Sequence, residues 1–415
     1  MNAEARSPVL ILTADTGSGH RSVSRAIAES AASQPEAGID VIELDPLASR
    51  DPLWRTSGRQ ARPEWGDVVV GMYGTVVVNA PWLWGMSYRA AKSPGTLATY
   101  GATYGHAVQQ RIRDAIEVTA PAAVVSVHPL VNHAMATARH GHFTTTGIRL
   151  PLMTIVTDLV DVHPWWVSQD VDQIIVSTPG AVESVAGRGI DRHRIVLNGQ
   201  PIREEFDLPQ PTARDMRARL NLDPEAPMVM FMGGGDGAGR MIEVIDACHA
   251  ELRGAGRPAV QFVAICGRNE RAISVIAARG WDMPVVALGH VTNVHEWMVA
   301  ADVVVTKPGP STITEAMALG RPLLVGPPLP GQEEGNVPYV CQTGAGRSYR
   351  TPTEGARTLR LMLDDPDGLE VMARNGRASY RPGATRALVG LVARLARTPA
   401  DGATADPVAV LPVPA

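Results

Sequence analysis

The stretch PVLILTADTGSGHRSVSRAIAES, residues 8–30, determines how the first half of the chain is interpreted. An apolar run with the character of a strand ends in a turn that contains Gly17 and Gly19. An amphipathic helical pattern follows this turn, with His20 near its start. A strand, a glycine turn and a helix in this order open a Rossmann-like unit, whose ligands bind beyond the carboxyl ends of the strands. The turn is therefore the first candidate for a functional loop.

The residues of this loop allow several interpretations. A P-loop is rejected, because it needs Gly-Lys-Ser/Thr where His20 and Arg21 stand. A dinucleotide fingerprint is weak, because Ser22 replaces its third glycine, although Glu43 follows at the distance of a ribose-binding acid. His20 itself is the third candidate, as a general base, because the positive end of a helix dipole favours a neutral imidazole. A purely structural turn, in which His20 caps or packs, agrees equally well with the loop alone.

Short apolar strands alternate with helical segments through most of the chain, which is typical of α/β proteins with parallel sheets. The pattern restarts after a charged, proline-bearing stretch near residue 205. We therefore expect two Rossmann-like domains that face each other across a cleft, residues 1–205 and residues 206–395. The Ala- and Pro-rich tail, residues 396–415, is expected to be disordered.

Composition narrows the function classes. The chain has 415 residues, of which 45% are hydrophobic, and these are enough for real cores. The formal charge of −4 and the lack of a basic run argue against a nucleic-acid partner. Three scattered cysteines argue against a disulfide framework, and the N-terminus does not resemble a secretory signal. These features predict a cytoplasmic protein.

An uncharged segment, residues 68–88, is long enough to span a bilayer. Its glycines, asparagine and proline would make a poor helix, so a spanning segment is disfavoured. Trp82, Trp84 and Tyr88 are residue types that prefer a membrane interface. The residues alone leave two interpretations open, shallow insertion into a membrane and an ordinary core or dimer surface.

Two loops of the second half carry unusual residues. FMGGGDGAGR contains Gly234 and Gly235, and such glycines let backbone amides approach an anion, although a flexible turn would look the same. In KPGPSTITE, Thr312 and Glu315 have the spacing of a capping box, which needs no ligand. The functional alternative is that Glu315 binds two hydroxyls of a ribose while Ser311 and Thr312 meet a diphosphate.

A third loop, GQEEGN, brings Gln332, Glu333 and Asn336 together. Amide and carboxylate groups suit sugar hydroxyls, whereas spacing alone favours a solvated loop. Elsewhere, Asp170 and Asp172 have the form of a metal-binding pair found in some sugar transferases. Such short patterns arise often by chance, so we expect no metal site there.

Several motifs together resemble a known family. LTADTGSGHRSVSRAI, TDLVDVHPWW, GQPIREEF, FMGGGDGAGR, TKPGPSTITEAMALGRPLL and GQEEGNVPYV follow one another here. They occur in the same order in monogalactosyldiacylglycerol synthases and related diacylglycerol glucosyltransferases of glycosyltransferase family 28. The resemblance covers roughly residues 8–385.

The resemblance implies the GT-B fold and transfer of a hexose from a UDP-sugar to a hydroxyl acceptor, most simply a diacylglycerol-type lipid. It implies inversion at the anomeric carbon, no required metal ion and no cofactor, since the UDP-sugar is a substrate. A non-lipid small-molecule acceptor, and a UDP-sugar epimerase on the same fold, stay open as alternatives.

The resemblance also assigns roles to residues. In the first domain, His20 and Asp15 are the expected catalytic residues, and Gly19, His163 and Trp165 are expected on the acceptor side. The donor should be bound in the second domain by Gly234, Gly235, Val291, Ser311, Thr312, Glu315, Gln332, Glu333 and Asn336. One departure is that the family's usual Gly-Gly-Gly-His is Gly-Ser-Gly-His here.

The uncharged segment lies where enzymes of this family meet the membrane. The resemblance therefore favours shallow insertion, and residues 60–105 become a candidate membrane-contacting segment. The expected location is cytoplasmic, with peripheral contact on the inner face of the cell membrane. Residues 50–105 match the family's sequences loosely.

Overall fold

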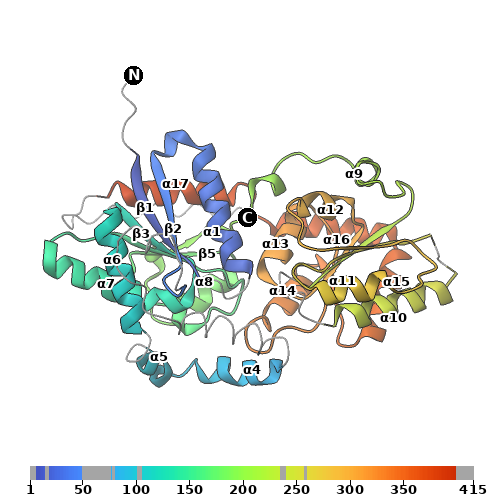
Figure 1. The fold of residues 1–415 in the computed structure, drawn as a ribbon, viewed down its shortest axis with the longest axis horizontal. Coiled ribbons are helices and arrows are strands. Elements are labelled where there is room, and N and C mark those ends of the chain that lie inside the picture. The colour runs from blue at the N-terminus through green and yellow to red at the C-terminus, as the bar shows by residue number, and fades with distance from the viewer. Residues whose placement is uncertain are drawn as a thin grey trace. The chain divides into compact units, whose positions relative to one another are not determined.

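The computed structural model describes residues 6–14, 18–48, 76, 80–100, 105–233, 240–256 and 259–398. Within them the chain forms two compact units, each with a six-stranded parallel sheet (Figure 1). This confirms the predicted α/β class with two parallel-sheet, Rossmann-like units. Three predicted site residues, Asp15, Gly234 and Gly235, lie outside the described residues, as do parts of the uncharged segment and the tail beyond Thr398.

The first unit contains the chain up to Arg203 and again from Gly383. The order of its parallel strands is β2-β1-β3-β4-β5-β6. The strands are β1 (Ser7–Leu12), β2 (Ile39–Leu44), β3 (Ala123–Ser126), β4 (Leu152–Ile155), β5 (Gln173–Val176) and β6 (Ile195–Leu197). Aliphatic residues dominate β1, β3 and β4 because helices cover both faces of the sheet.

Helices form a layer on each face of this sheet. One core joins the sheet to α6 (His106–Thr119), α7 (Pro129–Thr146) and α8 (Pro179–Ala186). The other joins it to α1 (Ser18–Ser33) and α17 (Ala384–Ala396). The other helices described in this unit are η1 (Pro35–Ala37), α4 (Pro81–Ala90), α5 (Pro94–Tyr100), η3 (Pro164–Trp166) and η4 (Arg192–Arg194).

The position of α17 differs from the expected domain of residues 206–395. Its Leu388 and Val392 are fully buried in the same core as Val9 and Ile27, and the helix lies beside α1 in Figure 1. The amide of Asn198 donates a 2.9 Å hydrogen bond to the carbonyl of Ala384. The periodicity of a helix shows that it has an apolar face but not which sheet that face covers, so the sequence assigned α17 to the wrong unit.

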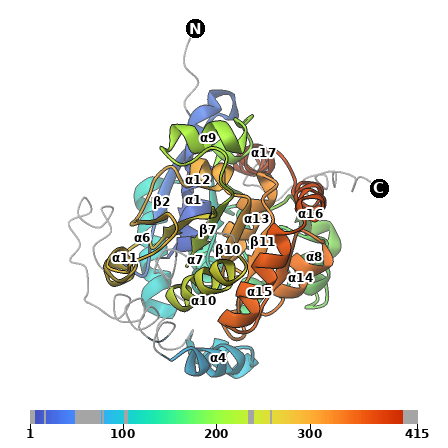
Figure 2. The same ribbon diagram turned by 90° about the vertical axis from the view of Figure 1, so that its right-hand side faces the viewer.

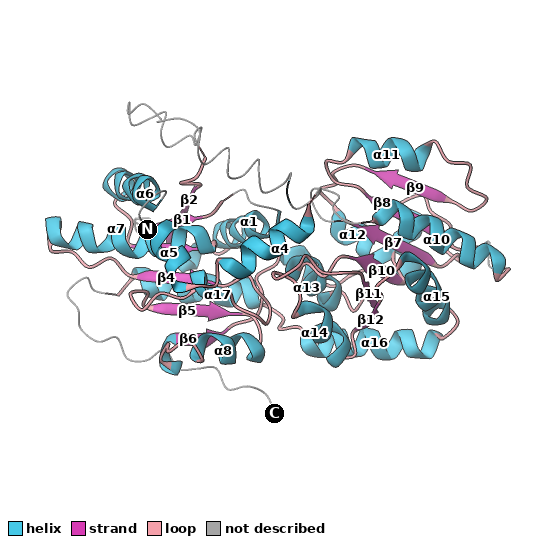
Figure 3. Cartoon of the chain, turned by 90° about the horizontal axis from the view of Figure 1, so that it is seen from below, coloured by secondary structure: helices cyan, strands magenta, loops and turns pink. Residues whose placement is uncertain are grey.

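The second unit comprises Glu204–Pro382 of the described chain, with strand order β12-β11-β10-β7-β8-β9 (Figure 3). The strands are β7 (Met228–Met232), β8 (Gln261–Ile265), β9 (Val285–Leu288), β10 (Val303–Thr306), β11 (Leu323–Val325) and β12 (Gly346–Ser348). Phe231 and Phe262 meet edge to face at 4.9 Å in its core, and α10 packs along α15 (Figure 2). The helices are η5 (Glu204–Phe206), α9 (Ala213–Arg219), α10 (Met241–Gly254), α11 (Glu270–Ala277), α12 (Val294–Ala300), α13 (Pro310–Ala318), α14 (Asn336–Gln342), α15 (Pro352–Leu363) and α16 (Pro366–Ser379).

Each sheet reverses its strand order once, and such a reversal opens a crevice at the carboxyl ends of the strands. In the first unit the reversal lies between β1 and β3. In the second it lies between β7 and β10. The loops after β1 and β3, and those after β7 and β10, therefore border the two crevices. The loops after the neighbouring strands β4 and β11 lie beside them. Among the helices that the structure describes, none has the length and apolar character needed to cross a bilayer.

Candidate functional site

His20 is the third residue of α1, the helix that follows β1, and 9% of its surface is exposed. Its Nδ1 is 3.0 Å from the carbonyl oxygen of Val127, which follows β3. The hydroxyl of Thr157, after β4, lies 3.1 Å from the same nitrogen. A carbonyl oxygen can only accept, so Nδ1 carries the proton and Nε2 keeps its lone pair.

The surroundings of His20 keep it neutral. Burial lowers the pKa of His20 to about 4, which outweighs the opposite effect of the Val127 carbonyl. Trp166 and His128 contribute rings to this environment, with centroids 5.9 and 4.4 Å from that of His20. A neutral imidazole with a lone pair on Nε2 can accept a proton from an alcohol, as the sequence predicted for a general base.

The turn HPWW, which follows β4, is held by one buried carboxylate. Asp158 Oδ2 accepts hydrogen bonds from the backbone of His163 at 3.1 Å and from the indole of Trp166 at 2.9 Å. His163 Nδ1 accepts from the backbone of Trp165 at 3.3 Å and so caps η3. Burial raises the pKa of Asp158 to about 6, and burial likewise lowers the pKa of His163 to about 4. Through Trp166, the turn reaches the ring of His20.

Two tyrosines connect this turn to the short helices before it. The ring of Tyr88 on α4 lies 4.6 Å from that of His163, and Tyr100 on α5 lies 5.0 Å from Trp165. The hydroxyl of Tyr100 also donates to the carbonyl of Leu130 at 2.9 Å. The predicted acceptor residues His163 and Trp165 thus lie together against α4 and α5, and Gly19 precedes His20 within α1.

In the second unit, the turn after β10 leads directly into α13. The helix begins at Pro310 with Gly309 as its N-cap and no side-chain cap. Thr312 is therefore inside the helix, and the capping box expected from the sequence as the structural alternative does not form. Glu315 lies farther along α13 and is 7% exposed, whereas Ser311 and Thr312 are partly exposed in its first turn.

The GQEEGN loop after β11 is tied to that turn. Glu333 Oε1 accepts from the ammonium of Lys307, and Oε2 accepts from the backbone of Leu329 at 3.1 Å. The amide of Asn336 donates to the carbonyl of Pro308 at 2.9 Å. Among the described residues, buried Gln332 Oε1 has no hydrogen-bond partner. Glu333 and Asn336 thus join two loops, and Gln332 has an acceptor to offer to a ligand.

The remaining predicted donor residue, Val291, is partly exposed in the loop between β9 and α12. Sequence reasoning gave no role to Lys307, Thr157, Asp158 or His128. Each of these four residues follows β3, β4 or β10, within three residues of the strand's end. That position is the signal that would have identified them.

Two residue patterns of the sequence have partners within the protein. Glu43, at the place of a ribose-binding acid, accepts a hydrogen bond from Ser24. Asp172 forms ion pairs with Arg139 at 3.0 Å and with Arg149, and it accepts from the backbone of Leu152 at 2.8 Å. In the part of the chain that is described, no three His, Cys, Asp or Glu side chains gather as metal ligands would.

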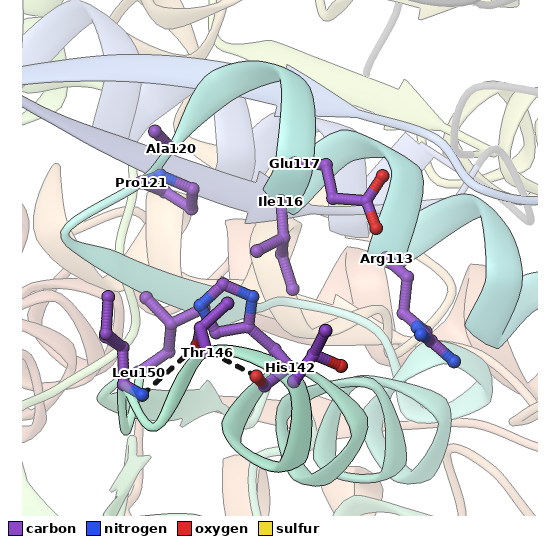
Figure 4. A pocket seen from close by; sticks show the side chains of 10 residues that line it. Arg113, Ile116, Glu117, Ala120, Pro121, His142, Thr146 and Leu150 are labelled. Carbon is purple, nitrogen blue, oxygen red and sulfur yellow. Dashed lines mark hydrogen bonds between the residues drawn. The ribbon is translucent and has the colours of Figure 1, made fainter.

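A separate cavity of about 380 Å³ lies between α6 and α7 in the first unit (Figure 4). Ile116 and Leu150 contribute apolar side chains, and Arg113 and His142 polar ones. Pro121, which precedes β3, also lines it. The cavity therefore lies at the amino ends of the strands, opposite the loops that carry His20.

Models of two known protein families match separate parts of the chain. The model of the monogalactosyldiacylglycerol synthase family matches residues 20–202, and that of the glycosyltransferase family 28 C-terminal domain matches residues 228–365. The chloroplastic monogalactosyldiacylglycerol synthase of Spinacia oleracea is 31% identical over 394 residues, which cover 93% of this chain and 72% of that protein. Monogalactosyldiacylglycerol synthase 2 of Arabidopsis thaliana, also chloroplastic, is 29% identical over 385 residues, with 92% and 79% covered.

Solved structures confirm the fold at low sequence identity. MurG of Acinetobacter baumannii has a TM-score of 0.57 at 14% identity, with 94% of this chain and 99% of that chain covered. The UDP-GlcNAc 2-epimerase of Neisseria meningitidis, bound to UDP-GlcNAc, has a TM-score of 0.58 at 13% identity, with 93% and 100% covered. Both likenesses support the two-Rossmann GT-B fold. From the matching family models and the relative at 31% identity, the chain belongs to the monogalactosyldiacylglycerol synthase family and is a UDP-sugar-dependent glycosyltransferase.

Proposed function

We propose that this enzyme transfers galactose from UDP-galactose to the free hydroxyl of a diacylglycerol, with inversion at the anomeric carbon and without a metal ion. The names of its relatives support the sugar and the acceptor. The observation that carries the proposal is the geometry of His20, whose Nδ1 proton is engaged by Val127 while Nε2 can accept a proton.

In the proposed reaction the acceptor hydroxyl gives its proton to His20 Nε2 as its oxygen attacks C1 of the sugar. The bond between C1 and the diphosphate oxygen breaks at the same time, and UDP leaves with the bonding electrons. The new imidazolium is stabilised by the Val127 carbonyl and the Thr157 hydroxyl, both within 3.1 Å of Nδ1. Asp15 is proposed to assist His20, in accordance with the family's motif.

The donor is proposed to lie along the loops after β7, β10 and β11. Glu315 would bind the ribose, and the first turn of α13 with Ser311 and Thr312 would meet the diphosphate, because exposed backbone amides at a helix start favour an anion. The ion pair between the partly exposed Lys307 and the buried Glu333 fixes the turn that leads into this helix. Gln332 would then accept a hydrogen bond from a sugar hydroxyl.

The other proposed donor contacts rest on the family's motifs. They place Gly234 and Gly235 beside the diphosphate, the backbone at Val291 beside uracil, and Glu333 and Asn336 beside the sugar. In the structure Glu333 and Asn336 already bond to the protein, so they would position the loop as well as contact the sugar.

The acceptor is proposed to arrive from a membrane surface on which α4 lies. Trp82, Leu83 and Met86 are 65%, 41% and 59% exposed, and their spacing places them on one helical face. Lys92, two residues after the end of α4, adds a positive charge that would favour anionic lipid headgroups. Because Tyr88 of α4 packs on His163, this apolar face is connected to the proposed acceptor side. We propose a peripheral enzyme on the cytoplasmic face of the cell membrane.

The decisive experiment incubates the purified protein with diacylglycerol vesicles and each of UDP-galactose, UDP-glucose and UDP-N-acetylglucosamine. The lipid product is then separated and its anomeric configuration determined by NMR. A β-galactosyl diacylglycerol formed from the α-linked donor would support the proposal. Conversion of the UDP-sugar to an epimer without consumption of lipid would instead identify an epimerase, and no turnover with any lipid acceptor would refute the acceptor assignment.

A further inference from the structure

His128 is a second buried histidine in contact with His20. His128 lies two residues after the end of β3, is 2% exposed and serves as the N-cap of α7. Its Nδ1 accepts a hydrogen bond from the backbone of Leu130 at 3.2 Å. An accepting Nδ1 carries no proton, so neutral His128 holds its proton on Nε2.

The two rings therefore have opposite tautomers. His20 carries its proton on Nδ1, because Val127 can only accept, and His128 carries its proton on Nε2. The ring centroids are 4.4 Å apart with an angle of 68° between the planes, so the edge of one ring meets the face of the other. A backbone group bonds to Nδ1 of each ring, so neither ring can turn without breaking a hydrogen bond.

We propose that His128 is a positioning residue for the transfer reaction: its ring keeps water away from His20 and holds the His20 imidazole in the orientation in which Val127 accepts from Nδ1. This inference rests on the proposed function, in which His20 is the base. His128 does not itself take the proton of the acceptor, because its Nε2 is already protonated.

The charges around the pair agree with this role. Among the described residues, Asp158 accepts a hydrogen bond from the indole of Trp166, whose ring lies near that of His20. Arg21 follows His20 on α1, and the titratable ring of His128 contacts the ring of His20 directly. Burial, and secondly the proximity of His20, lower the pKa of His128 well below its ordinary value. Both imidazoles are thus neutral before the reaction, and the proton from the acceptor creates a single positive charge on His20.

The test separates positioning from helix capping. Asn and Asp are both good N-caps, so His128→Asn and His128→Asp should preserve the start of α7. His128→Asn opens space for water beside His20, and His128→Asp adds a negative charge there. Both changes should raise the pH at which His20 titrates, by about one unit or more for Asn and further for Asp. Thr351→Asn, an exposed N-cap exchange on α15 in the second unit, is the matched control and should leave it unchanged.

The titration is followed by NMR of isotope-labelled histidines, with the His20 signal identified from a His20→Gln sample. The acid limb of the pH profile of kcat should shift in the same order, and kcat should fall more than KM for the UDP-sugar rises. A His20 titration that is the same in the wild type and in both variants would overturn the proposal, even if activity falls. The NMR result does not depend on turnover, so it stands apart from a failure of the proposed galactosyl transfer.

Discussion

In the proposed reaction, His20 is the residue on which the chemistry depends most directly. His20→Ala removes the Nε2 lone pair but leaves the second unit unchanged. We expect kcat for galactosyl transfer to fall by a factor of about 10² to 10⁴, the usual contribution of a general base, with UDP affinity preserved. Initial rates and calorimetric titration with UDP measure the two quantities. Thr157→Val, which removes one of the two groups near Nδ1, should lower kcat less. Unchanged turnover in His20→Ala would exclude His20 as the base.

Glu315 is the corresponding residue for the proposed binding of the donor. Since α13 has no capping box, the buried carboxylate of Glu315 does not serve as a cap partner of Thr312. Glu315→Gln should weaken binding of UDP by about tenfold or more, because a charged acceptor for two hydroxyls is lost. Calorimetric titration of the variant with UDP gives the affinity. The control is Glu354→Gln in the first turn of α15, and equal affinities of the two variants would remove Glu315 from the donor site.

His20 and Glu333 show which features of the candidate site could be predicted from the sequence. The position of His20 after a strand and a glycine turn, and the resemblance of the motifs, were sufficient to single it out. Its tautomer was not predictable, because it is set by Val127, which is 107 positions away along the chain. Likewise Glu333 was predicted as a sugar contact, and its ion pair with Lys307 depends on β10 and β11 being neighbours in the sheet.

At the scale of elements, the HPWW turn predicts a specific pH dependence. The pKa of Asp158 is raised by burial from 3.8 to about 6, so the folded protein binds a proton in that range that the unfolded chain does not. This group therefore stabilises the fold below pH 4, and its contribution is lost as the pH rises to about 6, by about 3 kcal/mol in all. Asp158→Asn should remove this loss, since the amide oxygen can still accept hydrogen bonds.

The measurement is urea unfolding of the wild type and Asp158→Asn at several pH values. The variant should gain stability relative to the wild type as the pH rises from 4 to 7. The buried histidines His20 and His163, whose lowered pKa values favour the folded state at higher pH, are present in both proteins and cancel in the comparison. A stability difference that does not vary with pH would show that Asp158 titrates normally.

The helix α4 makes a second prediction at this scale. Met86→Ser places a hydroxyl on its exposed apolar face and should reduce binding to anionic vesicles, because each apolar side chain removed from the interface weakens insertion. Flotation of the protein with vesicles measures the bound fraction. Leu361→Ser on α15 is the control, since Leu361 is 57% exposed and Met86 is 59%. Equal loss in the two variants would argue against α4 as the contact.

The elements themselves were largely predictable, and their partners were not. Short strands alternate with helices in both units, as the sequence predicted, because apolar runs bounded by turn residues are a strong local signal. The capping box considered for Thr312 and Glu315 would make Thr312 the N-cap, whereas α13 begins at Pro310, a residue that favours the first position of a helix. The error for α17 is of a different kind, because its contacts join the two ends of the chain.

For the whole molecule, the presence of two Rossmann-like units predicts how ligands should stabilise the protein. UDP and UDP-galactose at about a hundred times their dissociation constants should add about 2.7 kcal/mol to the stability of the unit that binds them. A thermal-shift panel that includes NAD checks this. Stabilisation by NAD alone would point back to the loop after β1 as a dinucleotide site, against which the pairing of Glu43 with Ser24 already argues.

The return of α17 to the first sheet also affects the order in which the protein can be made. The chain leaves the first unit at Arg203 and re-enters it at Gly383, where Thr385 bonds to both backbone groups of Ile202. During synthesis the second unit, which is one continuous stretch, emerges in full before the last helix of the first. Until then Val9, Ile27 and their neighbours lack part of their cover. The first unit is thus completed on the ribosome after the second, and a gene cut near residue 205 would separate it from a piece of its own core.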